Sequence, residues 1–155
     1  MRRYRLAEAA DYKRCHALMA RVDVPTQRLS WPTVMMEQDG EVLAFLSTRP
    51  TKTALIAGPL VVDKAQGSGF IVMRLIEAYE RLLQRAQVES YLFFVDQEND
   101  WWQGLVQKCL DGQALAEYVK GDVRTWYIRR FNHGWRRTIS SRAERGRESI
   151  TAAAS

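Results

Sequence analysis

The segment Gln66-Gly67-Ser68-Gly69 has the residue types and spacing in this chain that are best suited to chemistry. It follows an apolar run, and a long helical pattern begins directly after it. Two glycines let the backbone turn tightly and approach a ligand without obstruction by side chains. Amide groups at the start of a helix have no partner within the helix and carry partial positive charge. The spacing therefore predicts a phosphate-binding loop.

Two familiar phosphate motifs do not fit this loop. The P-loop requires a Lys-Ser/Thr pair, which is missing after Gly69. The dinucleotide fingerprint opens the first βαβ unit of its domain and has a third glycine where Val72 stands here.

A strand–loop–helix–strand unit must position the loop. The apolar run 54–62 predicts a strand, and Gly58-Pro59 predicts a bulge within it because proline donates no hydrogen bond to a strand ladder. Apolar residues at helical spacing predict a helix over 70–86, with Glu80 on its polar side, and 90–95 reads as a buried strand. Right-handed crossover would make these two strands parallel.

The other segments predict antiparallel hairpins and two more helices. Asp39-Gly40 is a strong hairpin signal, since both positions tolerate positive φ. The expected strands are 4–7, 33–37, 41–47, 114–119 and 123–130, and the expected helices are 9–22 and 101–110. We expect an α/β (α+β) protein with a mixed, mostly antiparallel sheet, helices on both faces and one central parallel βαβ unit.

Length and composition suit one globular domain with a tail. The chain has 155 residues, 46% hydrophobic and 26% charged, which excludes a disordered chain, a collagen-like repeat and a coiled coil. No apolar run approaches the ~20 residues that span a bilayer, and the start lacks the apolar core of a signal peptide. We therefore expect a soluble, cytoplasmic protein with a folded domain over 1–131 and a basic tail over 132–155.

The tail carries most of the net charge. It holds five arginines and two glutamates, a charge of +3 out of +5 for the chain. Such a tail can contact nucleic acid or an acidic partner, or simply remain solvated, and it is also a candidate for joining copies into an oligomer or a larger assembly. Sequence-specific nucleic-acid recognition is not expected, because these arginines lie outside the predicted fold.

Cysteine and histidine offer little chemistry. Cys15 and Cys109 have no C-x-x-C partner, so we expect no metal site and two thiols that pack as small apolar groups. His16 lies on or beside an apolar helical stripe, which favours a packed, hydrogen-bonded histidine over a catalytic one.

Around the loop, the chain resembles the GNAT superfamily of N-acetyltransferases. The family motif Gln/Arg-x-x-Gly-x-Gly/Ala follows the fourth strand and cradles the pyrophosphate of acetyl-coenzyme A. Gln66 falls on its first position, Gly67 on a glycine common in the family, and Gly69 on its central glycine. Gly58-Pro59 fits the family's bulged fourth strand, and Asn99 fits an asparagine near the pantetheine arm.

The resemblance implies a site for acetyl-coenzyme A as co-substrate, with a backbone amide on the fourth strand polarising the thioester. The implied cofactor-binding residues are Leu60, Val61, Val62, Gln66, Gly67, Ser68, Gly69, Phe70, Ile71 and Asn99.

The chain also departs from the family pattern. Ile71 replaces the final small residue of the motif, and Val106 stands where many members have a tyrosine general acid. The strand 54–62 contains no acidic residue to serve as base, which leaves Asp63, Tyr118 and Glu37 as candidate catalytic residues.

Two functions follow from these observations. One is an N-acetyltransferase that acts on a primary amine of a small molecule or protein. The alternative is a non-catalytic GNAT-like structural or assembly protein, such as a phage virion component anchored through residues 132–155. Acetyl-coenzyme A should stabilise the first by mass action and leave the second unchanged.

Overall fold

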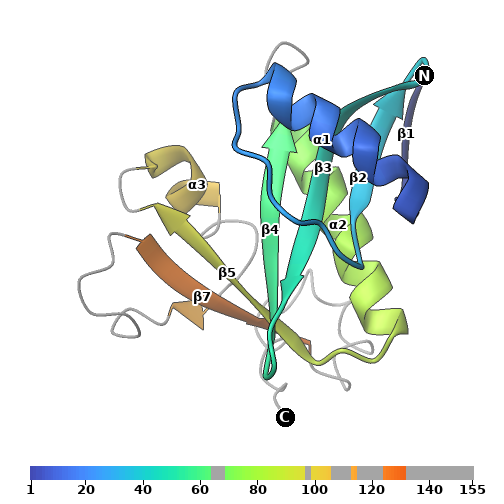
Figure 1. Cartoon of the computed structure of the whole chain (residues 1–155). Coiled ribbons are helices and arrows are strands. Elements are labelled where there is room, and N and C mark those ends of the chain that lie inside the picture. Colours follow the sequence, from blue (N-terminus) through green and yellow to red (C-terminus); the bar gives the residue numbers. More distant parts are fainter. Residues whose placement is uncertain (64–68, 97–98, 106–112, 115–123, 132–155) are drawn as a thin grey trace. The chain divides into compact units, whose positions relative to one another are not determined.

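A computed structural model describes residues 1–63, 69–96, 99–105, 113–114 and 124–131. The chain divides into two compact parts, Met1–Ala86 and Gln87–Ser155, which are described separately. The order of strands and helices along the chain is the one predicted from the sequence (Figure 1).

The strands of the first part form an antiparallel sheet in the order β1-β2-β3-β4. Their bounds are Arg2–Leu6 for β1, Val34–Gln38 for β2, Glu41–Pro50 for β3 and Leu55–Val62 for β4. The hairpin between β2 and β3 turns at Asp39 and Gly40, both at positive φ, as their residue types predict. The strand β3 continues past its predicted end at Ser47, because Thr48 to Pro50 pair with the start of β4.

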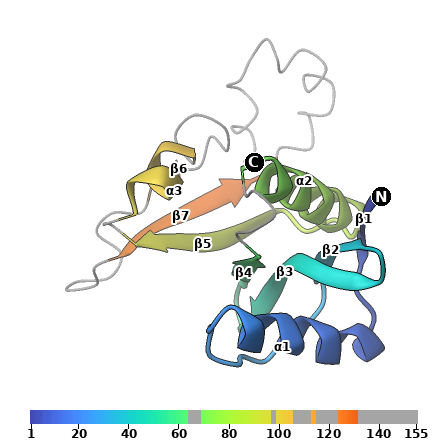
Figure 2. The ribbon, with the colours of Figure 1, turned by 90° about the horizontal axis from the view of Figure 1, so that it is seen from above.

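Helices cover both faces of this sheet, as predicted. The helix α1 (Tyr12–Arg21), preceded by the 3₁₀ turn Ala9–Asp11, lies on one face, and α2 (Gly69–Arg85) lies on the other (Figure 2). Alternate strand residues point to opposite faces, so each strand supplies both cores. The core on the α1 side consists of Ala7, Cys15, Leu18, Met19, Leu29, Met35, Val42, Phe45 and Val61.

On the α2 side, a buried hydroxyl pair joins helix and sheet. The Tyr79 hydroxyl lies 2.6 Å from Oγ1 of Thr48, which also donates to the Pro32 carbonyl at 2.8 Å. Burial raises the pKa of Tyr79 to about 12, so its hydroxyl stays protonated at neutral pH.

The expectation for Glu80 was wrong, because only 9% of this residue is exposed. It follows Tyr79 and lies one turn after Ile76, both of which are buried. The buried arc of α2 is therefore wider than its apolar stripe and includes this carboxylate.

The second part contains a smaller antiparallel arrangement. Its elements are β5 (Ser90–Asp96), α3 (Asp100–Leu105), β6 (Gln113–Ala114) and β7 (Arg124–Arg130). The pairing of β5 with β7 runs from Ser90 opposite Arg130 to Asp96 opposite Arg124, and β6 pairs with β7 as the predicted final hairpin requires. Val106, Cys109, Tyr118 and the predicted tail 132–155 lie outside the described residues.

Candidate functional site

The bulge predicted in β4 is present at Gly58 and Pro59. Leu60 pairs with Leu46, and Ala57 pairs with Thr48. Two residues of β4, Gly58 and Pro59, therefore lie opposite the single residue Ser47 of β3. Gly58 has φ +137°, a conformation that side chains disfavour, although a Cβ there would meet no atom within 4 Å. The glycine is therefore required by backbone conformation and not by crowding.

Beyond the bulge, β4 remains paired with β3 up to the start of the candidate loop. Val61 lies opposite Phe45, and the Asp63 amide donates to the Leu43 carbonyl at 2.8 Å. Since amides alternate in direction along a strand, those of Leu60 and Val62 point to the other edge, away from β3. This is the orientation that a donor to a thioester carbonyl on that side would need.

The first turn of α2 is open to solvent. Gly69 and Phe70 are exposed, whereas Ile71 and Val72 are 1% and 2% exposed. The Ile71 side chain is thus turned into the core and does not cover the outer side of the turn, where its bulk would have obstructed a phosphate.

The electrostatics of this turn suit an anion. No acidic residue occupies it, and the 17-residue helix places its positive dipole end there. Gln66, Gly67 and Ser68, the first part of the predicted motif, lie outside the described residues.

Asp63 follows β4 directly and is held by an ion pair. Its Oδ2 lies 3.4 Å from Nη2 of Arg21, which also reaches the Val42 carbonyl at 3.4 Å. The carboxylate therefore lies at the end of β4, on the chain segment that leads into the candidate loop.

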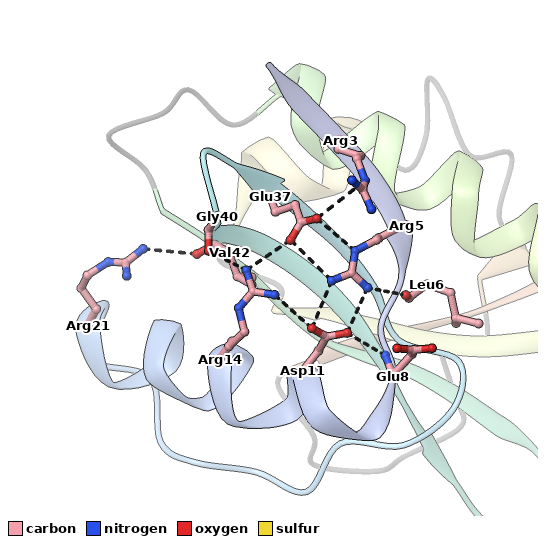
Figure 3. A network of polar contacts seen from close by, with 10 residues as sticks. All are labelled: Arg3, Arg5, Leu6, Glu8, Asp11, Arg14, Arg21, Glu37, Gly40 and Val42. Atoms are coloured by element: carbon pink, nitrogen blue, oxygen red, sulfur yellow. Dashed lines mark hydrogen bonds and ion pairs between the residues drawn. The ribbon is translucent and has the colours of Figure 1, made fainter.

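Glu37 lies on β2 within a charge cluster formed by Arg5, Asp11, Arg14 and Glu37 (Figure 3). Its Oε2 lies 3.0 Å from Arg5 Nε, and its Oε1 lies 3.2 Å from Arg14 Nη2. The hydrogen bond from Arg5 is the main cause that lowers the pKa of Glu37, and this makes it a weaker proton acceptor.

Asn99 is exposed and precedes α3, where its carbonyl accepts a hydrogen bond from the Gln103 amide at 3.0 Å. It occupies the cap position of that helix, as its residue type predicts. Among the candidate catalytic residues, the structure thus describes Asp63 and Glu37.

Other titratable side chains have structural roles. Burial raises the pKa of Cys15 to about 12, so its thiol packs as an apolar group, as predicted, and is not a nucleophile. His16 Nε2 lies 2.9 Å from the Gln27 carbonyl, which confirms a packed, hydrogen-bonded histidine. Among the described residues, no cluster of His, Cys, Asp or Glu could hold a metal ion, and no helix there is both long and apolar enough to cross a membrane.

The charge cluster and the Tyr79–Thr48 pair are features that reasoning from the sequence missed. No local pattern marks them, since their partners are brought together from separate strands and helices.

Comparison with known proteins identifies the fold through solved structures and not through sequence. No protein-family model matches the chain, and no curated protein matches its sequence. Solved structures do match its fold. An acetyltransferase of the GNAT family from Staphylococcus aureus Mu50 has a TM-score of 0.64 at 8% identity, covering 84% of this chain and 99% of that chain.

Two further structures agree. The ribosomal-protein-S18-alanine N-acetyltransferase from Escherichia coli has a TM-score of 0.61 at 15% identity, covering 83% of this chain and 91% of that chain. The diaminobutyrate acetyltransferase EctA from Paenibacillus lautus, solved with L-2,4-diaminobutyric acid and coenzyme A, has a TM-score of 0.59 at 14% identity and covers 83% and 93%. The predicted fold class is confirmed, and the chain has the fold of the GNAT acetyltransferases.

Proposed function

We propose that this protein is an acetyl-CoA-dependent N-acetyltransferase that transfers an acetyl group to a primary amine. The observation that carries the proposal is the open first turn of α2, where Gly69 and Phe70 face solvent while Ile71 is buried. In a chain with the GNAT fold, this turn follows the strand expected to hold the thioester. Fold alone does not fix function, so the proposal depends on this site.

The pyrophosphate of acetyl-CoA would bind the amides of the loop Gln66–Gly69 and of Phe70 and Ile71. Unpaired amides and the helix dipole favour two negative charges there. The pantetheine arm would run along β4 from Val62 toward Gly58, and Asn99 would contact the same arm.

The reaction requires a neutral amine beside the thioester carbonyl. Its nitrogen attacks the carbonyl carbon, a C–N bond forms, and the C–S bond breaks as CoA leaves as a thiolate. An amide of Leu60 or Val62 would stabilise the charge that develops on the oxygen. The proton lost by the nitrogen passes to water or to Asp63, and a chain without a dedicated acid or base would react ~10²–10⁴-fold more slowly for each missing group.

The acceptor is a primary amine of a small molecule or of a protein. Neighbours with this fold include both kinds, one named for an alanine of a ribosomal protein and one solved with diaminobutyric acid. Tyr118 stays a candidate catalytic residue on the basis of the sequence.

Titration of the full chain with acetyl-CoA tests the proposal. Binding should stabilise the fold by ~2.7 kcal/mol at one hundred times the dissociation constant. Gly69→Glu should abolish this stabilisation by placing a bulky carboxylate in the exposed first turn, whereas Arg81→Gln, at an exposed position about three turns further along α2, should retain it. The absence of any thermal shift and of binding heat for the natural chain would favour the non-catalytic assembly protein instead.

A further inference from the structure

The strand β1 forms an edge of the sheet in the first part of the chain (Figure 1). It pairs with β2 on one side, and the part of the chain that the structure describes contains no strand on its other side. An edge strand of this kind can pair with an extended segment of another chain. The backbone and the side chains of β1 therefore decide which segment can bind there.

The backbone of β1 presents hydrogen-bonding groups at the open edge. The Ala7 amide donates to the Thr33 carbonyl at 2.7 Å and so points toward β2. Backbone groups alternate in direction along an antiparallel strand, so the amides of Leu6 and Tyr4 point away from β2. The Leu6 carbonyl, on the same side, accepts a hydrogen bond from Arg5 Nη1 at 3.2 Å. Two amides and the Tyr4 carbonyl are thus placed where a further strand would pair.

On the α1 face of the sheet, Arg3 brings positive charge to this edge. Its side chain is 69% exposed, and its Nε lies 3.7 Å from Glu37 Oε2. That carboxylate already binds Arg5 and Arg14 at 3.0 and 3.2 Å (Figure 3). The two arginines and two carboxylates of the charge cluster balance one another, so Arg3 adds a positive charge in excess.

On the α2 face, Arg74 brings a second positive charge beside β1. Its guanidinium carbon lies 5.2 Å from the centre of the Tyr4 ring. Its Nε lies 3.7 Å from Glu77 Oε1, and the Arg74 and Glu77 side chains are 49% and 56% exposed. An exposed pair of this kind contributes little free energy, so the guanidinium can exchange this carboxylate for one from a partner.

We propose that β1 is a docking edge for an acidic segment of a partner protein, which binds in an extended conformation as an additional strand. The partner's backbone would bond to that of Tyr4 and Leu6, and its carboxylates would pair with Arg3 and Arg74. Neighbouring strands lie ~4.8 Å apart, which is within the reach of an arginine side chain. The proposal concerns β1 and does not depend on acetyl-CoA binding beside β4, the outer strand on the other side of this antiparallel sheet.

Charge favours an acidic partner over a second copy of this chain. Two β1 edges paired with each other would bring arginines close together, and like charges on neighbouring strands are destabilising. The segment 132–155, with five arginines and two glutamates, has the same sign of charge as the edge. A nucleic acid could pair with the arginines but would leave the outward amides of β1 without strand partners. The arginines therefore select against self-association and in favour of an acidic strand.

Fluorescence anisotropy of the full chain with a labelled hexapeptide of alternating glutamate and threonine tests the proposal. A peptide with glutamine in place of glutamate should bind about tenfold more weakly, because it cannot pair with the arginines. A glutamate peptide with every backbone amide methylated keeps its carboxylates but donates no strand hydrogen bonds, and it should also bind about tenfold more weakly. Amide exchange measured by NMR should slow at Tyr4 and Leu6 when the glutamate peptide binds.

Substitutions in the protein locate the contact. Arg3→Gln and Arg74→Gln should each weaken binding of the glutamate peptide about threefold and leave the glutamine peptide unchanged. Lys52→Gln, in the exposed turn between β3 and β4, removes the same charge away from β1 and should change neither affinity.

A proline substitution tests the backbone of β1 directly. Leu6→Pro removes an outward amide at a sheet edge, where proline is tolerated, and should weaken the glutamate peptide about tenfold. Leu6→Val keeps the amide and should bind the peptide as the natural protein does. Should Leu6→Pro unfold at a lower temperature, the methylated peptide still tests strand pairing on the natural protein.

The remaining outcomes overturn the proposal. Equal binding of the glutamate and glutamine peptides would show that charge does not select the partner, and equal binding of the methylated peptide would show that no strand is added. Tighter binding of a labelled oligothymidylate than of the glutamate peptide would identify a nucleic-acid surface instead. Absence of binding by the glutamate peptide, or unchanged affinity in Arg3→Gln and Arg74→Gln, would exclude β1 as the docking edge.

Discussion

The Arg5 guanidinium binds both carboxylate oxygens of Asp11, with Nη1 3.0 Å from Oδ2 and Nη2 3.1 Å from Oδ1. Arg14 Nη1 reaches Oδ1 of the same carboxylate at 3.0 Å, and the Glu8 amide donates to Oδ2 at 2.9 Å. Asp11 thereby joins the edge strand β1 to the start of α1 (Figure 3).

Replacing this carboxylate should destabilise the first part of the chain. The hydrogen bond from Arg5 is the main cause that lowers the pKa of Asp11 from 3.8 to about 2. A carboxyl group whose pKa is lower in the folded than in the unfolded protein stabilises the fold at pH values above its unfolded pKa. This stabilisation is lost as the pH falls from about 4 toward 2. Asp11→Asn should therefore lower the free energy of unfolding by about 2 kcal/mol at pH 7 and flatten the acid limb of the stability curve.

Urea denaturation of Asp11→Asn between pH 2 and 7 measures this effect. Asp39→Asn is the matched control, because the Asp39 side chain is 80% exposed and its ion pair with the terminal amine is long, at 3.9 Å. Equal acid limbs for Asp11→Asn and the natural protein would contradict the assignment.

The buried hydroxyl pair Thr48–Tyr79 should be energetically coupled. Thr48→Val keeps the shape of the side chain but removes its bonds to Tyr79 and to the Pro32 carbonyl, and should destabilise by roughly 1–3 kcal/mol. Tyr79→Phe should lower the free energy of unfolding by less in the Thr48→Val background than in the natural protein. A double-mutant cycle in urea should give a coupling of about 1 kcal/mol, whereas strict additivity would show that the two hydroxyls do not interact.

The bulge in β4 should depend on glycine. Gly58→Ala forces a side chain into φ +137° and should destabilise by roughly 1–3 kcal/mol. Gly104→Ala on α3 also meets no atom within 4 Å and should be neutral or stabilising, since alanine favours a helix. Thermal unfolding of the two variants compares them, and equal midpoints would show that the bulge tolerates a side chain.

The thiol of Cys15 should resist alkylation in the folded protein. Burial raises its pKa to about 12, so very little thiolate is present at pH 8. In a Cys109→Ser background, iodoacetamide should label Cys15 only as fast as the folded protein opens and exposes the thiol. Urea should therefore accelerate labelling. Labelling as fast as that of a free thiol would contradict the burial of this residue.

Local rules explain what could be predicted. The Asp39-Gly40 turn and the Gly58-Pro59 bulge each depend on backbone conformations that few residue types allow. Apolar periodicity likewise predicted the strands and helices in their correct order. The predicted loop, tail and catalytic residues are not tested by these features and stay predictions.

The sequence by itself determined the elements, their order and the segment best suited to phosphate, because turn chemistry and periodicity act over a few neighbouring residues. The tertiary structure alone decided that Glu37 is an ion-pair partner, that Ile71 turns inward and that Glu80 is buried. Arg5 and Glu37 are 32 positions apart and meet only because β1 pairs with β2. The charges around a side chain depend on such neighbours. The spacing of residues along the sequence does not show which neighbours these will be.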